Sequence, residues 1–131
     1  LKPILCCGES LALRKAGTYK EWIARQIKWD LTDVTADQVK ELVIAYEPIW
    51  SIGPGKTPAD KEYITKIAKF VKEKTGGMDV VYGGGLKQAN AAMLASIDEI
   101  DGGLIALTRF QGEIGYYPEE YLEIIQLYME G

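Results

Sequence analysis

The sequence predicts an α/β fold, a single (β/α)4 unit over residues 1–131 in which four parallel strands alternate with helices. Two observations predict it. Four short apolar runs are continuously hydrophobic rather than alternating, which is typical of parallel strands covered on both faces. The segments between and after them carry apolar residues at helical spacing. Such repeated strand–helix units form a parallel sheet with right-handed crossovers.

The predicted strands are residues 3–7, 42–46, 79–82 and 103–107. The apolar stripes of the predicted helices are Trp22, Ile23, Ile27 and Leu31, then Ile64, Ile67, Ala68 and Val71, then Met93, Leu94 and Ile97, and finally Tyr121, Ile124, Ile125 and Tyr128. The second of these helices has the clearest predicted start, with Thr57 as N-cap, Pro58 at the first helical position and Asp60 three residues after the cap. Gly76 and Gly77 are predicted to end it.

Composition restricts the partners. The net charge is −4 and the sequence pI is about 4.9. Without clusters of lysine or arginine, this balance argues against a nucleic acid or an acidic membrane surface, whereas a small polar or anionic metabolite stays possible. No apolar run reaches the roughly 18 residues that a membrane helix needs. Cys6 and Cys7 are adjacent in an apolar run, so we expect buried thiols of a reduced, cytoplasmic protein rather than a disulfide.

Glu47 is the sharpest candidate for chemistry. It directly follows the second predicted strand and precedes a glycine-bearing loop, with Tyr46 and Trp50 nearby. Partial removal from water raises the proton affinity of a carboxylate toward what a general base needs. The alternative is an exposed glutamate before a proline turn. The Gly-x-Gly-Lys-Thr run in this loop argues only weakly for a nucleotide-binding P-loop, because the first glycine of that motif would fall at Trp50.

The run from Ala45 to Thr57 resembles the catalytic signature of the triosephosphate isomerase family. Three other motifs of that family follow the same order in this chain: Cys7-Gly8-Glu9 with Arg14 and Gly17, Tyr82-Gly83-Gly84-Gly85, and the segment 103–109. The resemblance covers essentially the whole chain and matches the second half of that enzyme. It implies half of a (β/α)8 TIM barrel, since a complete one typically needs about 250 residues.

The resemblance also implies roles. Glu47 would move a proton between neighbouring carbons of a small phosphorylated triose, and residues 48–58 would form the closing lid. The implied phosphate-binding and lid residues are Ile52, Gly53, Gly55, Gly84, Gly85, Ala106 and Leu107. Supporting positions behind them are Glu9, Trp50 and Tyr82. For Glu9 and Arg14 the alternative is an ordinary surface ion pair. No cofactor and no metal are implied.

Three departures from the family pattern lie at lid or phosphate positions. Gly85 stands where the family usually has serine, and Ala106-Leu107-Thr108-Arg109 stands where it usually has Gly-Gly-Ala-Ser. Arg109 could pair with a phosphate as a charged donor, or Leu107 could block the site. Pro58 stands where many members have an alanine whose N–H bonds the tyrosine hydroxyl of the next loop, and proline has no N–H.

The resemblance assigns a lysine, a histidine and an asparagine of the active site to the other half, and this sequence contains no histidine. A base without an electrophile at the developing oxyanion is a poor isomerase, so we expect the chain alone to be inactive or nearly so. Open sheet edges and an open apolar face would invite aggregation. We therefore expect a complementary N-terminal half-barrel chain or self-association.

The chain begins without methionine and close to its first predicted strand, so we also expect a preceding segment in the gene or in another chain. Two functions follow. The first is an isomerase half that interconverts dihydroxyacetone phosphate and glyceraldehyde 3-phosphate. The second is a non-catalytic half-barrel, either a scaffold or a weak phosphate binder. A third, technical reading is a fragment of a longer enzyme, which leaves the family unchanged.

Overall fold

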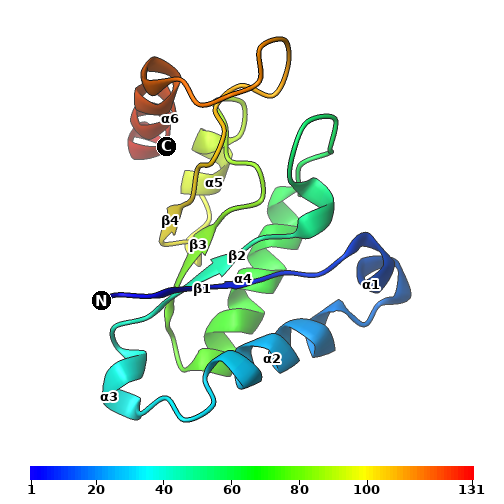
Figure 1. Cartoon of the computed structure of the whole chain (residues 1–131), viewed down its shortest axis with the longest axis vertical. Helices are drawn as coiled ribbons and strands as arrows, with labels where there is room; N and C mark the ends of the chain where they lie inside the picture. Colours follow the sequence, from blue (N-terminus) through cyan, green and yellow to red (C-terminus); the bar gives the residue numbers. More distant parts are fainter.

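A computed structural model describes all residues, 1–131, and contains one four-stranded parallel sheet (Figure 1). The strands are β1 (Ile4–Cys7), β2 (Val43–Tyr46), β3 (Asp79–Tyr82) and β4 (Gly102–Gly103), and they lie side by side in chain order. Because each strand pairs with the next one along the chain, the strand order is that of half a TIM barrel. The predicted α/β class is confirmed.

The helices are α1 (Leu11–Ala16), α2 (Tyr19–Asp30), α3 (Ala36–Val39), α4 (Lys61–Thr75), α5 (Ala91–Ala95) and α6 (Pro118–Glu130), with a 3-10 turn η1 (Ile49–Ser51). Helix α2 packs on β1 and α4, α4 packs on β3, and α5 packs on α6. Figure 1 shows the long α4 running behind the sheet, with α2 below it and α6 at the far end of the chain. None of these helices combines the length and the apolar composition of a membrane span.

The core lies between one sheet face and these helices. In register, Ile44 pairs with Leu5 and Val80, and Tyr46 pairs with Cys7 and Tyr82. These residues join one apolar cluster with the stripes of α2 and α4. The α4 stripe is confirmed in full, since Ile64, Ile67, Ala68 and Val71 are all 0% exposed.

The other stripes are confirmed only in part. In α2, Ile23 and Ile27 are buried, whereas Trp22 and Leu31 are partly exposed. Ile97 is buried but follows α5, which ends at Ala95. In α6 only Ile124 is buried. This helix packs on the short helix α5, which covers only one stripe of its surface.

The predicted start of α4 is wrong. The helix begins at Lys61, and its N-cap is Asp60, whose carboxylate accepts the backbone N–H of Tyr63 at 2.8 Å. Asp60 has the extended backbone of an N-cap (φ −80°, ψ 165°), so Thr57 and Pro58 belong to the preceding loop. The predicted end is confirmed, because Gly76 is the left-handed C-cap.

The fourth strand is also shorter than predicted. Only Gly102 and Gly103 are strand residues, paired with Val81 and Tyr82. The ladder continues to the bond from Leu104 N–H to the Tyr82 carbonyl, at 2.9 Å, and then stops. As an edge strand, β4 has no second neighbour to hold residues 105–107 in strand geometry.

The second sheet face is open. It carries Ile4, Cys6, Val43 and Val81, of which Ile4 is 51% exposed. The expectation that both cysteines are buried is therefore wrong for Cys6, which is exposed, and right for Cys7. Both are free thiols. The cause is strand alternation, which points Cys7 into the core and Cys6 to the open face.

Candidate functional site

Glu47 lies where β2 ends, and backbone pairing continues through it. Its N–H donates to the Cys7 carbonyl at 2.7 Å, and the N–H of Gly83 donates to the Tyr46 carbonyl at 2.9 Å. Both bonds extend the parallel ladder past the last strand residues. The backbone that carries the predicted base is thus fixed by its two neighbouring strands.

The Glu47 side chain lies against Gly83. A Cβ built on Gly83 would come within 2.8 Å of both Cγ and Oε1 of Glu47, so only glycine leaves room for this carboxylate. Glu47 itself is partly buried. Strand alternation places it on the same open face as Cys6, and the pKa of the Cys6 thiol is raised by burial and, next, by the Glu47 charge. The carboxylate therefore stands at the rim of the open sheet face.

The predicted lid, residues 48–58, is anchored at its start. Pro48 and Ser51 are buried, and the Ser51 hydroxyl lies 2.9 Å from the carbonyl oxygens of both Pro48 and Gly84. The following residues 54–57 are exposed, and Ile52 is 38% exposed. One end of the lid is thus fixed to the loop after β3 while its tip, with Gly53 and Gly55, projects outward.

The loop after β3 explains the missing serine at position 85. Gly85 has φ +99°, in the left-handed region that side-chain-bearing residues rarely adopt, and an added Cβ would lie 3.3 Å from the Ser51 carbonyl oxygen. Its own carbonyl accepts the Asn90 amide at 3.0 Å. Glycine at 85 therefore fits this loop conformation.

Tyr82 is buried, and its hydroxyl donates to the Gly84 carbonyl at 2.9 Å. Burial raises the pKa of Tyr82, while the Ser51 hydroxyl and the backbone N–H of Ala59 act in the opposite direction. The Tyr82 hydroxyl is thus held within its own loop, through the Gly84 carbonyl, and the lack of an N–H at Pro58 leaves this bond intact.

Glu9 is 0% exposed, so the surface ion pair considered for it is wrong. Its carboxylate accepts three neutral donors on Oε1: the Tyr46 hydroxyl at 2.8 Å, the Trp50 indole N–H at 2.8 Å and the Tyr63 hydroxyl at 2.9 Å. The Tyr46 hydroxyl is also 3.1 Å from Oε2. Burial and the neighbouring Glu9 charge raise the pKa of Tyr46, and burial and the hydrogen bond to Glu9 raise that of Tyr63, so both hydroxyls stay protonated donors.

Arg14 completes this group by stacking rather than by an ion pair. Its guanidinium carbon is 4.1 Å from the Trp50 ring centroid and 4.4 Å from that of Tyr63. The two rings meet edge to face, with centroids 5.7 Å apart. We call Glu9, Arg14, Tyr46, Trp50 and Tyr63 the Glu9 cluster. It holds the start of the lid to the loop after β1.

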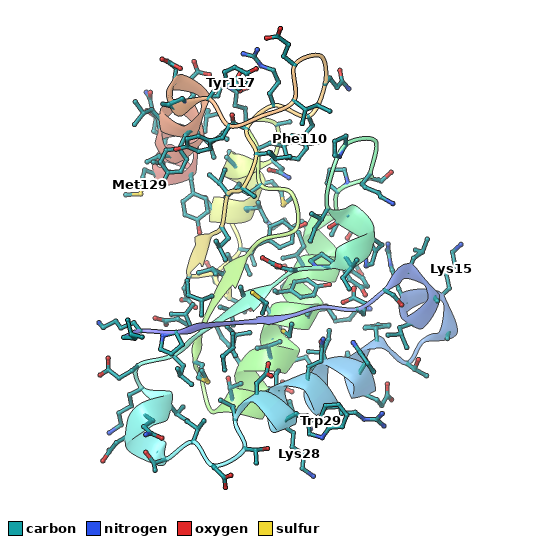
Figure 2. The ribbon with its side chains drawn as sticks, viewed as in Figure 1. Lys15, Lys28, Trp29, Phe110, Tyr117 and Met129 are labelled. Atoms are coloured by element: carbon teal, nitrogen blue, oxygen red, sulfur yellow. The ribbon has the colours of Figure 1, made fainter.

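The predicted phosphate-binding residues gather only in part. A cavity of about 60 Å³ is lined by Ile52, Gly53, Gly83, Gly85, Leu86, Leu104, Ala106, Leu107 and Phe110. Five of the seven predicted residues line it, namely Ile52, Gly53, Gly85, Ala106 and Leu107. The other two, Gly55 and Gly84, do not. Figure 2 shows Phe110 on the segment between β4 and α6, on the side of the lid loop. Leu107 and Phe110 make this end of the site apolar.

Arg109 does not face this cavity. Its guanidinium pairs with Glu120 at 2.6 Å and stacks on the Tyr117 ring, 3.8 Å from the centroid. The hydrogen bond to Glu120 raises the pKa of Arg109, and the same bond lowers the pKa of Glu120. A short antiparallel bridge between Arg109 and Gly115 closes the loop. Arg109 therefore fastens this loop to α6, and the idea that it pairs with a phosphate is not supported.

Sequence reasoning missed Tyr63, Ser51 and Phe110. Tyr63 adjoins the buried stripe of α4, so its apolar neighbours offered a signal that it is buried, though none for its hydrogen bond. Ser51 stands in the lid run but has no pattern that sets it apart. Phe110 lies beyond the predicted fourth strand, and only the turn after β4 brings it to the cavity.

Comparison with known proteins agrees with this geometry. The sequence model of the triosephosphate isomerase family matches residues 1–127. The chain is 44% identical over 133 residues to a triosephosphate isomerase of Lactobacillus delbrueckii subsp. lactis and 43% identical to that of Lactiplantibacillus plantarum, in each case over 95% of this chain and 50% of the relative. For Ligilactobacillus salivarius the values are 41% identity over 134 residues, 95% of this chain and 51% of the relative. The chain thus spans about half the length of the curated relatives it matches, and it belongs to the triosephosphate isomerase family.

Proposed function

We propose that this chain forms the catalytic-base half of an isomerase that interconverts dihydroxyacetone phosphate and glyceraldehyde 3-phosphate. The observation that carries the proposal is the placement of Glu47, fixed between two strand ends, packed on Gly83 and adjoining a lid that is anchored through Ser51 and Trp50. A base must be held this closely to take a proton from a carbon and return it to the neighbouring one. The names of the relatives support the same reaction.

The substrate phosphate would bind at the cavity beside the lid tip. Backbone N–H groups of Gly53 and Gly85 suit an anion because they need no charged side chain. The present volume of about 60 Å³ is that of roughly two waters, so the phosphate enters only with a shift of the lid or of Leu107. Cofactor and metal have no part in this proposal, since proton transfer by a carboxylate needs neither.

The second half of the site would come from a complementary chain or segment with four further strands. Two features support this. The outer edges of β1 and β4 have no strand partner. On the open sheet face, the apolar side chain of Ile4 is left exposed. A histidine or lysine near the developing oxyanion would be supplied from there, because this chain has no histidine. We place the assembled protein in the cytoplasm, where thiols such as Cys6 stay reduced.

Complementation tests the proposal. The chain is mixed with the N-terminal half of the Lactobacillus delbrueckii relative, assembly is checked by native mass spectrometry, and isomerisation of glyceraldehyde 3-phosphate is followed in a coupled assay. Activity is expected for the mixture, and for neither half alone. The matched control is Glu47→Gln, which assembles but does not turn over. An assembled pair that is inactive with Glu47 intact overturns the proposal.

A non-catalytic half-barrel is the second candidate, and one observation favours it. Leu107 lines the cavity where the family pattern has glycine, and Phe110 adds a second apolar wall, which leaves little room for a phosphate. The two functions separate on phosphate binding. In the assembled pair, a weak 31P shift change with inorganic phosphate that Leu107→Gly strengthens, without turnover, would favour the binder. No shift at all would favour the scaffold.

A further inference from the structure

Tyr63 connects the segment after the lid to the carboxylate that holds the segment before it. Trp50 stands at the start of the lid, and Tyr63 stands in the first turn of α4, just after the lid ends. Both donate to the same oxygen, Oε1 of Glu9, at 2.8 Å and 2.9 Å. Tyr63 is held in place, because it is only 7% exposed and its backbone N–H donates to the carboxylate of the N-cap residue Asp60.

The three donors on Oε1 compete. A carboxylate oxygen offers two lone-pair directions, and Tyr46, Trp50 and Tyr63 all point at this one. Only Tyr46 has a second acceptor within reach, Oε2 at 3.1 Å. Each of the three bonds is therefore weaker than it would be with fewer donors. Because Trp50 is part of the lid, its bond to Glu9 is one of those that the lid must break to move, as is the bond from Ser51 to the Gly84 carbonyl.

Tyr63 also matters after Trp50 leaves. Glu9 is fully buried, and a buried carboxylate that loses donors without water to replace them is costly. With Tyr63 and Tyr46 still bound, the carboxylate keeps a hydroxyl donor for each oxygen. Without the Tyr63 hydroxyl, the Glu9 carboxylate would keep only one donor, the Tyr46 hydroxyl. The Tyr63 hydroxyl thus favours release of Trp50 twice: it weakens the bond between Trp50 and Glu9, and it stabilises the Glu9 carboxylate after that bond is broken.

We propose that Tyr63 is a positioning residue that sets the lid equilibrium: its hydroxyl weakens the bond between Trp50 and Glu9 and satisfies Glu9 once Trp50 is released. The inference rests on the proposed function only for the claim that lid movement serves catalysis. The hydrogen-bond competition itself belongs to this chain alone, and it can be measured without turnover.

Hydrogen exchange of the Trp50 indole N–H tests the proposal, because this proton exchanges only when Trp50 is released. It is followed by NMR in the full chain, where Trp50→Phe assigns the signal among three tryptophans. For Tyr63→Phe we expect exchange to slow about three- to tenfold, the effect of one net hydrogen bond. The matched control is Tyr19→Phe, which removes a hydroxyl from the ring that stacks on Tyr63 without touching Glu9. Unchanged or faster exchange in Tyr63→Phe overturns the proposal.

A second variant keeps the test valid even if Tyr63→Phe does not fold. Difluorotyrosine at position 63 keeps the shape and strengthens the donor, so the Trp50 indole should exchange faster, and unchanged or slower exchange overturns the proposal. In the complemented enzyme, Tyr63→Phe should lower kcat/KM by the factor seen in exchange, whereas Tyr19→Phe should not. A complemented enzyme without turnover would count against the proposed function, while the indole exchange would still decide the role of Tyr63.

Discussion

The side chain of Glu47 packs directly on the α-carbon of Gly83, at a distance where no Cβ fits. The contact joins the ends of β2 and β3, because Gly83 also donates its backbone N–H to the residue before Glu47. The orientation of the carboxylate is therefore set by the neighbouring strand as well as by its own. A change at Gly83 should act on the base without changing the base.

Gly83→Ala is expected to move the Glu47 carboxylate. The added methyl meets the flexible end of the side chain, so the carboxylate shifts and the fold is largely kept. A displacement of about 1 Å at a reacting group costs on the order of a hundredfold in kcat. The measurement is kcat in the complemented enzyme together with the melting temperature. Gly115→Ala, where an added methyl would meet only the Tyr117 ring at an ordinary 3.6 Å, is the control for an unspecific glycine effect.

Glu47→Asp should lower kcat by about a hundredfold or more, because the shorter side chain withdraws the carboxylate from the substrate. The melting temperature should hardly change, since Glu47 makes no side-chain hydrogen bond or ion pair that aspartate would break. Kinetics and thermal unfolding are measured on the same preparation. If stability falls in step with kcat, Glu47 is a structural residue and the proposed base is wrong.

Most of the fold followed from local sequence signals. The first three strands were predictable because continuous apolar runs are typical of parallel strands, although helices cover only one face of this sheet. The α4 stripe was predictable because its apolar residues recur at helical spacing. The errors have different causes. Thr57 and Asp60 can both cap a helix, and the sequence pattern does not show that Asp60 is the one that does so, through its local bond to the Tyr63 N–H. The length of β4 depends on a neighbour that the sequence does not display.

The site divides in the same way. Glu47, the lid and the loop after β3 were predictable because each is a contiguous motif with a family resemblance. The Glu9 cluster was only half predictable. It joins Glu9 to residues 37, 41 and 54 positions further along the chain. No periodicity links such positions, so the role of Tyr63 emerges only from the packing of α4 beside the loop after β1.

The two cysteines should differ in reactivity. Cys6 is exposed, whereas Cys7 is 3% exposed and burial, with the Glu9 charge, raises its pKa to about 12. Iodoacetamide should therefore alkylate Cys6 in the folded chain and Cys7 only after unfolding. Glu47→Gln should speed alkylation of Cys6, because the Glu47 charge is, after burial, the next cause of its raised pKa. Mass spectrometry of time points measures both rates, with Glu62→Gln as control. An unchanged Cys6 rate in Glu47→Gln would contradict the nearness of the two groups.

The Arg109–Glu120 pair predicts a pH dependence of stability. The pKa of Glu120 is lowered in the folded chain, so this group binds its proton less readily than in the unfolded chain. Its stabilising effect is present above the ordinary pKa of 4.5 and is lost as the pH falls through the lowered folded value. The melting temperatures of the wild type and Glu120→Gln should thus differ at about pH 7 and converge as the pH falls below 4.5 and through the lowered folded value. A constant difference across this range would show that Glu120 acts through packing alone.

Removing the Glu9 carboxylate should destabilise the fold through the donors left behind. Glu9→Leu keeps similar volume but leaves the hydroxyls of Tyr46 and Tyr63 buried without an acceptor, at about 1–3 kcal/mol for each. Replacing donors and acceptor together by apolar groups can be nearly neutral, so adding Tyr46→Phe and Tyr63→Phe should restore at least half of the lost free energy of unfolding. Urea unfolding of the single and triple variants measures this, with Glu41→Leu at an exposed site as the control. If the triple variant is less stable than Glu9→Leu alone, ring packing rather than hydrogen bonding accounts for the stability of the cluster.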